Sequence, residues 1–226
     1  MRLIHYINEG KNIPWNKIQK DCQPYLKDLK STEDFLYSGR KINSPALYFK
    51  RKVRKDRKPL DTPEIIHNLL DDMFKKKFGH NLRSESLFVS KLKRVARCYG
   101  NLYVVLPIGK YSLYTNHHIN DLWEKILYEI DEFYYFNMHN QELMGSYDDA
   151  IKCLWWDLEE FSKLKQTIMQ VIDIAISNYK EVLNNKITKK SPEIMLLTDE
   201  YYGINVVDFT EKYIFSKLKG IPYETN

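Results

Sequence analysis

The alternation of short apolar runs with longer amphipathic stretches constrains the fold of this chain more than any other feature. Runs with the length and composition of β-strands are expected at residues 34–39, 46–49, 86–90, 102–108, 193–198 and 201–207. Stretches with apolar residues at helical spacing predict helices at residues 14–30, 63–78, 120–138, 146–161 and 163–184. Groups of strands separated by groups of helices are typical of α+β proteins, whereas a regular alternation would indicate a parallel sheet. We therefore predict an α+β fold.

The stretch at residues 63–78 has the clearest helix boundaries in the chain. Thr62 is expected to cap its amino end, and Pro63 suits the first helical position, where its missing N–H has no intrahelical partner. The three lysines at positions 75–77 favour the negative carboxyl end of a helix, and Gly79 is expected to end it. These local signals predict one complete helix.

Three further features refine the expected secondary structure. Pro24 is expected to divide the 14–30 helix into two short pieces. The last two apolar runs predict a β-hairpin around Asp199 and Glu200, and the residues after Asp208 predict a short final helix.

The length of 226 residues suits one domain that carries a large insertion. We predict a single domain over residues 1–226, in which residues 1–112 and 190–208 form a sheet core and residues 113–189 form a helical insertion.

No membrane association is expected, because no run of apolar residues approaches 18 and the first residues lack the pattern of a signal peptide. Cys22, Cys98 and Cys153 lie far apart and match neither a zinc spacing nor a disulfide framework. This cysteine usage fits a reducing compartment, so a cytoplasmic location is expected.

Charge is distributed unevenly along the chain. Residues 1–110 contain 24 Lys and Arg against 11 Asp and Glu, whereas residues 111–226 contain 11 against 19. The densest basic run, KRKVRKDRK at residues 50–58, has seven basic side chains. Such a run attracts phosphates, so nucleic acid is one candidate partner, and a solvated surface loop is the alternative. The candidate nucleic-acid-binding residues are Arg51, Arg54, Arg57 and Lys58.

Motifs for several other chemistries are missing from the sequence. No His lies at a metal-ligand spacing from a Cys or another His, so we assign no metal site. The chain also lacks a glycine-rich nucleotide-binding loop and the Gly-x-Ser-x-Gly turn of serine hydrolases.

A series of short motifs in a particular order carries more information than any single residue. A strand ending in Gly-Arg is followed by the 63–78 helix, a Phe-x-Ser strand, an Ala-x-x-Tyr segment with its own strand, and a Glu opening a late strand. The corresponding residues are 36–40, 87–90, 96–100, 102–108 and 193–195. In this order of motifs the chain resembles the ADP-ribosyltransferase superfamily. Residues 54–109 are also similar to uncharacterised proteins of tailed bacteriophages, which carry an Arg-x-x-Arg-x-Pro-x-Asp-Thr segment like that at residues 54–62.

The resemblance implies an ADP-ribosyltransferase-like split antiparallel sheet with a helical insertion. It implies that NAD is the substrate and that ADP-ribose is transferred to a macromolecule, such as a host or phage protein, in the host cytoplasm. Glu193 would stabilise the oxocarbenium-like transition state, and Ser90 would orient Glu193 or the ribose. The residues expected to bind NAD are Ser38, Gly39, Arg40 and Tyr99, of which Tyr99 would stack on nicotinamide.

The first motif departs from the family pattern. The family has Arg or His before the glycine, where this chain has Ser38, so the cation expected to hold the pyrophosphate is Arg40, Arg54 or Arg57. Two other functions therefore stay open: a nucleic-acid-binding protein that uses the 50–58 loop, and a structural or inhibitory phage protein that keeps the fold without the chemistry.

Overall fold

The computed structural model describes residues 13–41, 46–59, 62–116, 122–128, 159–187, 193–207 and 209–223. Two four-stranded antiparallel sheets form its centre, so the predicted α+β class is confirmed. Sheet A contains, in spatial order, β1 (Leu36–Arg40), β4 (Asn101–Pro107), β8 (Glu200–Asn205) and β2 (Tyr48–Lys52). Sheet B contains β3 (Leu87–Val89), β7 (Ile194–Leu197), β5 (Ser112–Thr115) and β6 (Lys180–Val182).

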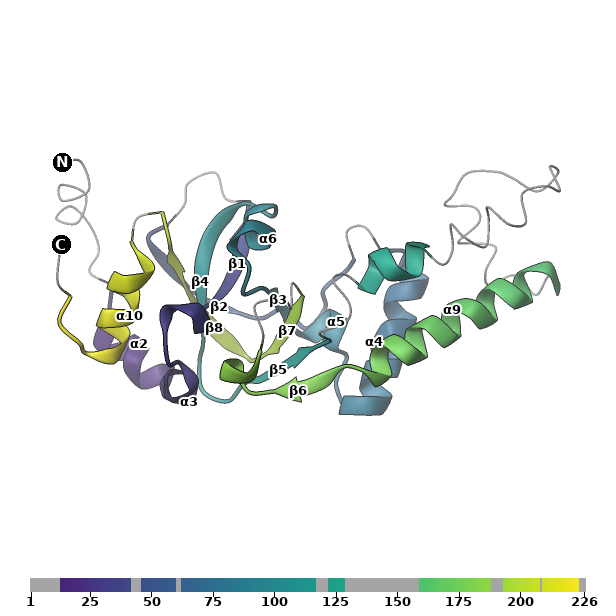
Figure 1. Cartoon of the computed structure of the whole chain (residues 1–226), viewed down its shortest axis with the longest axis horizontal. Coiled ribbons are helices and arrows are strands. Elements are labelled where there is room, and N and C mark those ends of the chain that lie inside the picture. The colour runs from purple at the N-terminus through teal and green to yellow at the C-terminus, as the bar shows by residue number, and fades with distance from the viewer. Residues whose placement is uncertain are drawn as a thin grey trace.

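Helices gather at the two ends of the molecule, with the sheets between them (Figure 1). The helices at one end are α2 (Trp15–Asp21), α3 (Gln23–Asp28) and α10 (Glu211–Lys219). Those at the other end are α4 (Glu64–Phe78), α5 (Leu82–Glu85) and α9 (Glu159–Ser177). The short helix α6 (Lys93–Arg97) lies beside β1, and two 3-10 turns are formed by η1 (Thr32–Asp34) and η2 (Asn184–Lys186).

Sheet B separates two hydrophobic cores, because side chains alternate between the faces of a strand. Ile194 and Leu196 of β7 belong to the core that sheet A shares with α2, α3 and α10. Met195, which lies between them in the sequence, belongs to the core formed by α4 and α9. Residues on β7 are thus buried on both sides, which gives this strand a rigid surrounding.

The predicted 63–78 helix is confirmed as α4, but the expected cap is wrong. Pro63 occupies the N-cap position and no side chain caps the helix. The Thr62 hydroxyl instead accepts a 3.3 Å hydrogen bond from Nη2 of Arg83, and Thr62 is buried. Gly79 ends the helix in the left-handed conformation, with a φ of 80°.

Other local predictions are also confirmed. The first helix is divided next to Pro24 into α2 and α3, Pro107 ends β4, and a short final helix forms as α10. Residues 122–128 of the predicted 120–138 helix are helical, whereas residues 129–158 lie outside the described part of the chain.

Two predictions of secondary structure are wrong. The expected hairpin does not form, because β7 pairs with β3 and β5 in sheet B while β8 pairs with β4 and β2 in sheet A. The helix expected over residues 163–184 ends at Ser177, and the chain then turns into β6, which pairs with β5. The segment assigned to a helical insertion therefore also contributes strands to sheet B.

Among the described residues, the structure contains no helix with both the length and the apolar character needed to cross a membrane.

Candidate functional site

The two sheets meet at an isolated bridge between Tyr37 of β1 and Ser90, the residue after β3. The Tyr37 N–H donates to the Ser90 carbonyl at 2.8 Å, and the Ser90 N–H donates to the Tyr37 carbonyl at 2.9 Å. On its other side β3 pairs with β7, and Val89 is opposite Ile194. Ser90 and Glu193 therefore lie at neighbouring ends of adjacent strands, so three segments distant in sequence meet here.

Glu193 is largely buried, with 14% of its side chain exposed. The Tyr179 hydroxyl donates to Glu193 Oε1 at 3.0 Å, and Arg83 Nη1 lies 3.6 Å from Oε2. The Thr115 hydroxyl donates to the Glu193 carbonyl at 3.0 Å. These contacts fix a carboxylate at the start of a strand that is buried on both faces, which is the rigid placement that a catalytic carboxylate requires.

Gly39 lets α6 approach β1 closely. A Cβ at this position would lie 1.8 Å from the Ala96 carbonyl oxygen and 3.1 Å from the Gly100 nitrogen. Gly100, at a φ of 126°, is itself in close contact with the Arg40 backbone. This packing brings the segment that contains Tyr99 next to the end of β1, and the Tyr99 side chain is exposed.

Arg40 stacks on aromatic rings of sheet A. Its guanidinium carbon lies 5.2 Å from the centroid of the Phe49 ring and 5.4 Å from that of Tyr201. Burial and the neighbouring Arg51 lower the pKa of Arg40, and within the described ranges its buried Nε has no hydrogen-bond partner. Arg40 thus lies over the sheet that Ser38 also occupies, and Ser38 is buried opposite Tyr103.

The Ser90 hydroxyl has a local role. It accepts a 3.0 Å hydrogen bond from the Leu92 N–H, at the start of α6, and Ser90 is 3% exposed. Ser90 therefore fixes the position of α6 and the junction between the sheets.

Two further arginines lie close to Glu193. The guanidinium carbons of Arg57 and Arg83 lie 4.3 Å and 5.0 Å from the centroid of the Phe88 ring. Burial, followed by the charge of Arg83, lowers the pKa of Arg57. Glu193 acts in the opposite direction on the Arg57 pKa.

A buried polar network supports Arg83. Asp71 Oδ1 accepts hydrogen bonds from the backbone N–H groups of Arg83 at 2.7 Å and Ser84 at 3.2 Å. The Ser84 hydroxyl donates to Asp71 Oδ2, and His67 Nε2 lies 2.9 Å from the same hydroxyl. The backbone N–H of Arg57 donates to the Ser84 carbonyl at 3.3 Å. The short helix α5 therefore positions both arginines.

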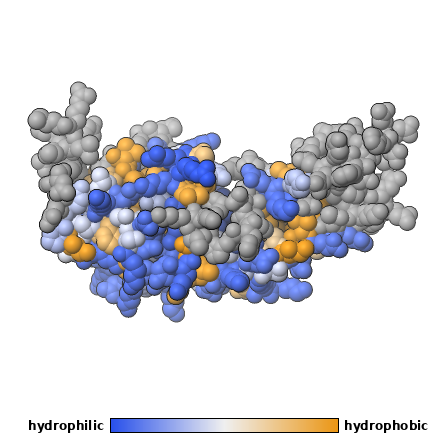
Figure 2. All heavy atoms as spheres, in the orientation of Figure 1, coloured by the Kyte–Doolittle hydropathy of each residue, from blue (hydrophilic) through white to orange (hydrophobic). Residues whose placement is uncertain are grey.

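The rest of the basic run faces solvent. Arg51, Arg54 and Lys58 are exposed, in contrast to Arg57. Arg54 pairs with Asp56 at 3.4 Å. Figure 2 shows that hydrophilic side chains cover much of one face of the molecule, with apolar ones in scattered patches.

Three lysines of the other basic segments make structural contacts. Lys77 donates to three carbonyl groups at the end of α9, and Lys93 pairs with Glu211. Lys91 is buried against Asp34 and the Asn184 carbonyl. These side chains are therefore not part of one continuous basic surface.

Two residues near Glu193 were missed in the sequence, Arg83 and Tyr179. Arg83 has no distinctive neighbours in sequence, and Tyr179 lies in a stretch expected to be helical. Phe88 belongs to the Phe-x-Ser motif, but the alternating pattern of β3 indicates only a packed aromatic residue.

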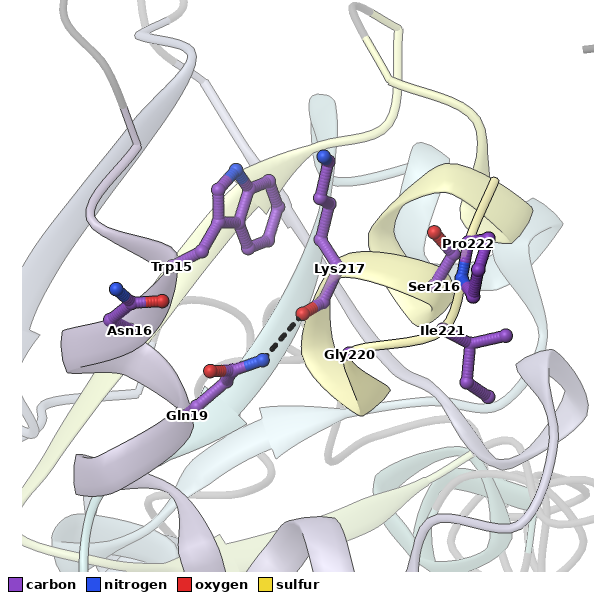
Figure 3. Close-up of a pocket in the computed structure, with 8 residues that line it drawn as sticks. All are labelled: Trp15, Asn16, Gln19, Ser216, Lys217, Gly220, Ile221 and Pro222. Carbon is purple, nitrogen blue, oxygen red and sulfur yellow. Dashed lines mark hydrogen bonds between the residues drawn. The ribbon is translucent and has the colours of Figure 1, made fainter. Parts of the chain in front are cut away.

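A shallow hollow of about 460 Å³ lies away from the Glu193 site, between α2 and α10. Figure 3 shows Trp15 and Gln19 on one side and Lys217 on the other, with the Gln19 amide donating to the Lys217 carbonyl at 2.7 Å. The residues of the Glu193 site do not line it. Within the described ranges, no group of three His, Cys, Asp or Glu is placed to hold a metal ion.

Comparison of the chain with protein-family models, curated proteins and solved structures finds no match.

Proposed function

We propose that this protein is an ADP-ribosyltransferase-like enzyme that cleaves NAD and transfers ADP-ribose to a macromolecule of a bacterial host. The observation that carries the proposal is the position of Glu193. Its carboxylate is largely buried and is held by Tyr179 and Arg83. Glu193 directly precedes β7 and lies beside Ser90 at the junction of the two sheets.

The strand order supports the finer fold assignment. Sheet A ends at β1 and sheet B begins at β3, and a single-residue bridge joins the two edges. Two joined antiparallel sheets support the proposed split antiparallel sheet, with the Gly-Arg and Phe-x-Ser motifs on β1 and β3 and the Glu motif at β7. Those motifs are the ones in which the sequence resembles the superfamily.

The proposed chemistry uses the carboxylate as an electrostatic stabiliser. The bond between the ribose carbon and the nicotinamide nitrogen breaks, nicotinamide leaves with the electron pair, and positive charge develops on the ribose. A fixed carboxylate next to the ribose stabilises that charge more in the transition state than in the ground state. The acceptor's nucleophilic atom then bonds to the ribose carbon and loses its proton.

The test compares Glu193→Gln with Glu200→Gln in the presence of NAD labelled in its ADP-ribose part and a bacterial lysate. The amide that replaces the Glu193 carboxylate would retain an acceptor for the Tyr179 hydroxyl but lose the charge. Glu200 is the matched control, because it too lies where a strand begins, as the first residue of β8, but pairs with Lys50 on the surface at 2.6 Å.

The wild type and Glu200→Gln should label a lysate component. Glu193→Gln should label it roughly 100-fold less, the loss typical of removing one transition-state stabilising group. Circular dichroism and thermal unfolding show whether each variant is folded. Equal labelling by folded Glu193→Gln, or no labelling by any form, would contradict the proposal.

Nucleic-acid binding is the second candidate, and the exposed basic side chains of the edge strand β2 favour it. Arg51 and Lys52 lie at the outer edge of sheet A and are exposed. If they contact phosphates, charge reversal at both positions should weaken binding to a DNA or RNA oligonucleotide and reduce its salt dependence. Binding unchanged by the reversal would remove this candidate.

A further inference from the structure

Two guanidinium groups share one aromatic ring beside Glu193. Arg57 lies 4.3 Å and Arg83 lies 5.0 Å from the Phe88 ring centroid. Stacking on a ring holds a guanidinium in place without using its N–H donors. Two nitrogens of Arg83 are nevertheless engaged, because Nη2 donates to the Thr62 hydroxyl and Nη1 lies 3.6 Å from Glu193 Oε2. Phe88 is therefore a platform for two arginines.

The charges around this pair do not balance. Arg83 is 3.6 Å from Glu193, and Glu193 also acts electrostatically on Arg57. Asp71, the other nearby carboxylate, already accepts hydrogen bonds from two backbone N–H groups and the Ser84 hydroxyl. Burial lowers the pKa of His67, so this side chain favours its neutral form and adds no charge. Within the described ranges, the two positive charges thus face the single carboxylate of Glu193, besides that of the engaged Asp71.

One buried donor of the pair has no acceptor among the described residues. The Nε of Arg83 is buried and has no hydrogen-bond partner among the residues that the structure describes, and Arg83 itself is 9% exposed. The Arg57 guanidinium has no ion-pair partner within the described part of the chain. Buried donors without acceptors are costly, and a bound anion would supply the acceptors and offset the repulsion.

We propose that Arg57 and Arg83, stacked on Phe88, bind the pyrophosphate of the dinucleotide substrate. This inference rests on the function proposed above. Guanidinium groups match phosphate oxygens in bidentate geometry, and two of them match the two negative charges of a pyrophosphate.

The surroundings favour a small ligand over a nucleic acid polymer. Arg83 has only 11% of its side chain exposed, whereas the exposed arginines of the basic run lie elsewhere on the loop and on β2. Ser38 occupies the position on β1 where the family pattern has a cation, and Arg40 on the same strand stacks on Phe49 and Tyr201. Arg57 and Arg83 would supply the missing positive charge.

The test is calorimetric binding of ADP-ribose, inorganic pyrophosphate and adenosine to the full chain. Arg57→Gln should weaken ADP-ribose and pyrophosphate about 10- to 100-fold, as expected for removing hydrogen bonds to a charged group, and leave adenosine unchanged. Arg54→Gln is the matched control on the same loop, because Arg54 is exposed and pairs only with Asp56 among the described residues. Its affinities should stay within about 2-fold of the wild type.

Glu193→Gln should change the affinity for pyrophosphate in the opposite direction. Removing the carboxylate beside the two arginines should tighten pyrophosphate binding, because a repulsive charge is lost. If Arg57→Gln does not fold, Arg57→Lys keeps the charge without the forked donors and should weaken binding by a smaller factor.

The outcomes separate this inference from the proposed function. Equal affinity of wild type and folded Arg57→Gln for ADP-ribose would overturn the inference, even where Glu193-dependent labelling is seen. No pyrophosphate binding by the wild type would also overturn it. Pyrophosphate binding that depends on Arg57, without any cleavage of NAD, would uphold the anion site and overturn the transferase.

Discussion

Replacement of Gly39 by alanine tests whether α6 packs on β1 as the structure describes. The new Cβ would lie 1.8 Å from the Ala96 carbonyl oxygen, whereas a carbon–oxygen contact needs roughly 3.3 Å. The obstacle is backbone, so β1 and α6 must separate by about 1.5 Å, and no side-chain rotation can relieve the contact. Overpacking of this kind costs roughly 1–3 kcal/mol or more, so we expect Gly39→Ala to lose about 3 kcal/mol of the free energy of unfolding.

Urea unfolding followed by circular dichroism measures this loss, and thermal unfolding should show a Tm lower by about 6–12 °C. Gly79→Ala is the control, because Gly79 has a φ of 80° and nothing within 4 Å of a Cβ there. That variant should lose only the cost of a left-handed backbone, about 1–2 kcal/mol. A loss for Gly39→Ala no greater than for Gly79→Ala would refute the close packing of α6 and β1.

Two further variants test the elements that surround the site. Burial lowers the pKa of His67 from 6.5, so below pH 6.5 the unfolded chain binds a proton that the folded chain does not, and stability falls as the pH drops. Between pH 7 and pH 5, urea unfolding should show a smaller loss of unfolding free energy for His67→Gln than for the wild type. An equal loss in both would contradict the lowered pKa of His67. Lys77 donates to three carbonyl groups at the end of α9, so Lys77→Met should lose about 1 kcal/mol of unfolding free energy while Lys76→Met changes little. Equal effects of the two lysine substitutions would argue against this contact.

Helix α4 could be predicted from the sequence because local signals mark both of its ends. Pro63 restricts the chain before the first turn, and Gly79 takes the left-handed conformation that ends the helix. The expected cap failed for a non-local reason, because the Thr62 hydroxyl is used by Arg83, 21 residues away in the sequence.

The pairing of β7 and β8 could not be decided from local signals. The link between these strands is short enough for a hairpin, but long-range contacts anchor it. The Val53 N–H donates to the Asp199 carbonyl at 2.8 Å, and the Ile108 N–H donates to the Glu200 carbonyl at 2.9 Å. Each strand also finds two neighbours from distant segments, so the pairing is decided by the whole sheet.

The candidate site could be predicted only in part. The order of motifs singled out Ser90 and Glu193, and the structure brings their segments together. Arg83 and Tyr179 could not be found in the same way, because their contact with Glu193 depends on how α5 and the end of α9 dock on sheet B. Arg57 was a candidate for phosphate binding, but its separation from the exposed members of the basic run is a tertiary feature.

A crystal structure of the protein with ADP-ribose tests the central claim most directly. The account predicts the pyrophosphate within hydrogen-bonding distance of the Arg57 and Arg83 guanidinium groups and the ribose that bears nicotinamide in NAD beside the Glu193 carboxylate. Binding of ADP-ribose elsewhere, for example in the hollow between Gln19 and Lys217, with Glu193 still sequestered by Tyr179 and Arg83, would contradict it.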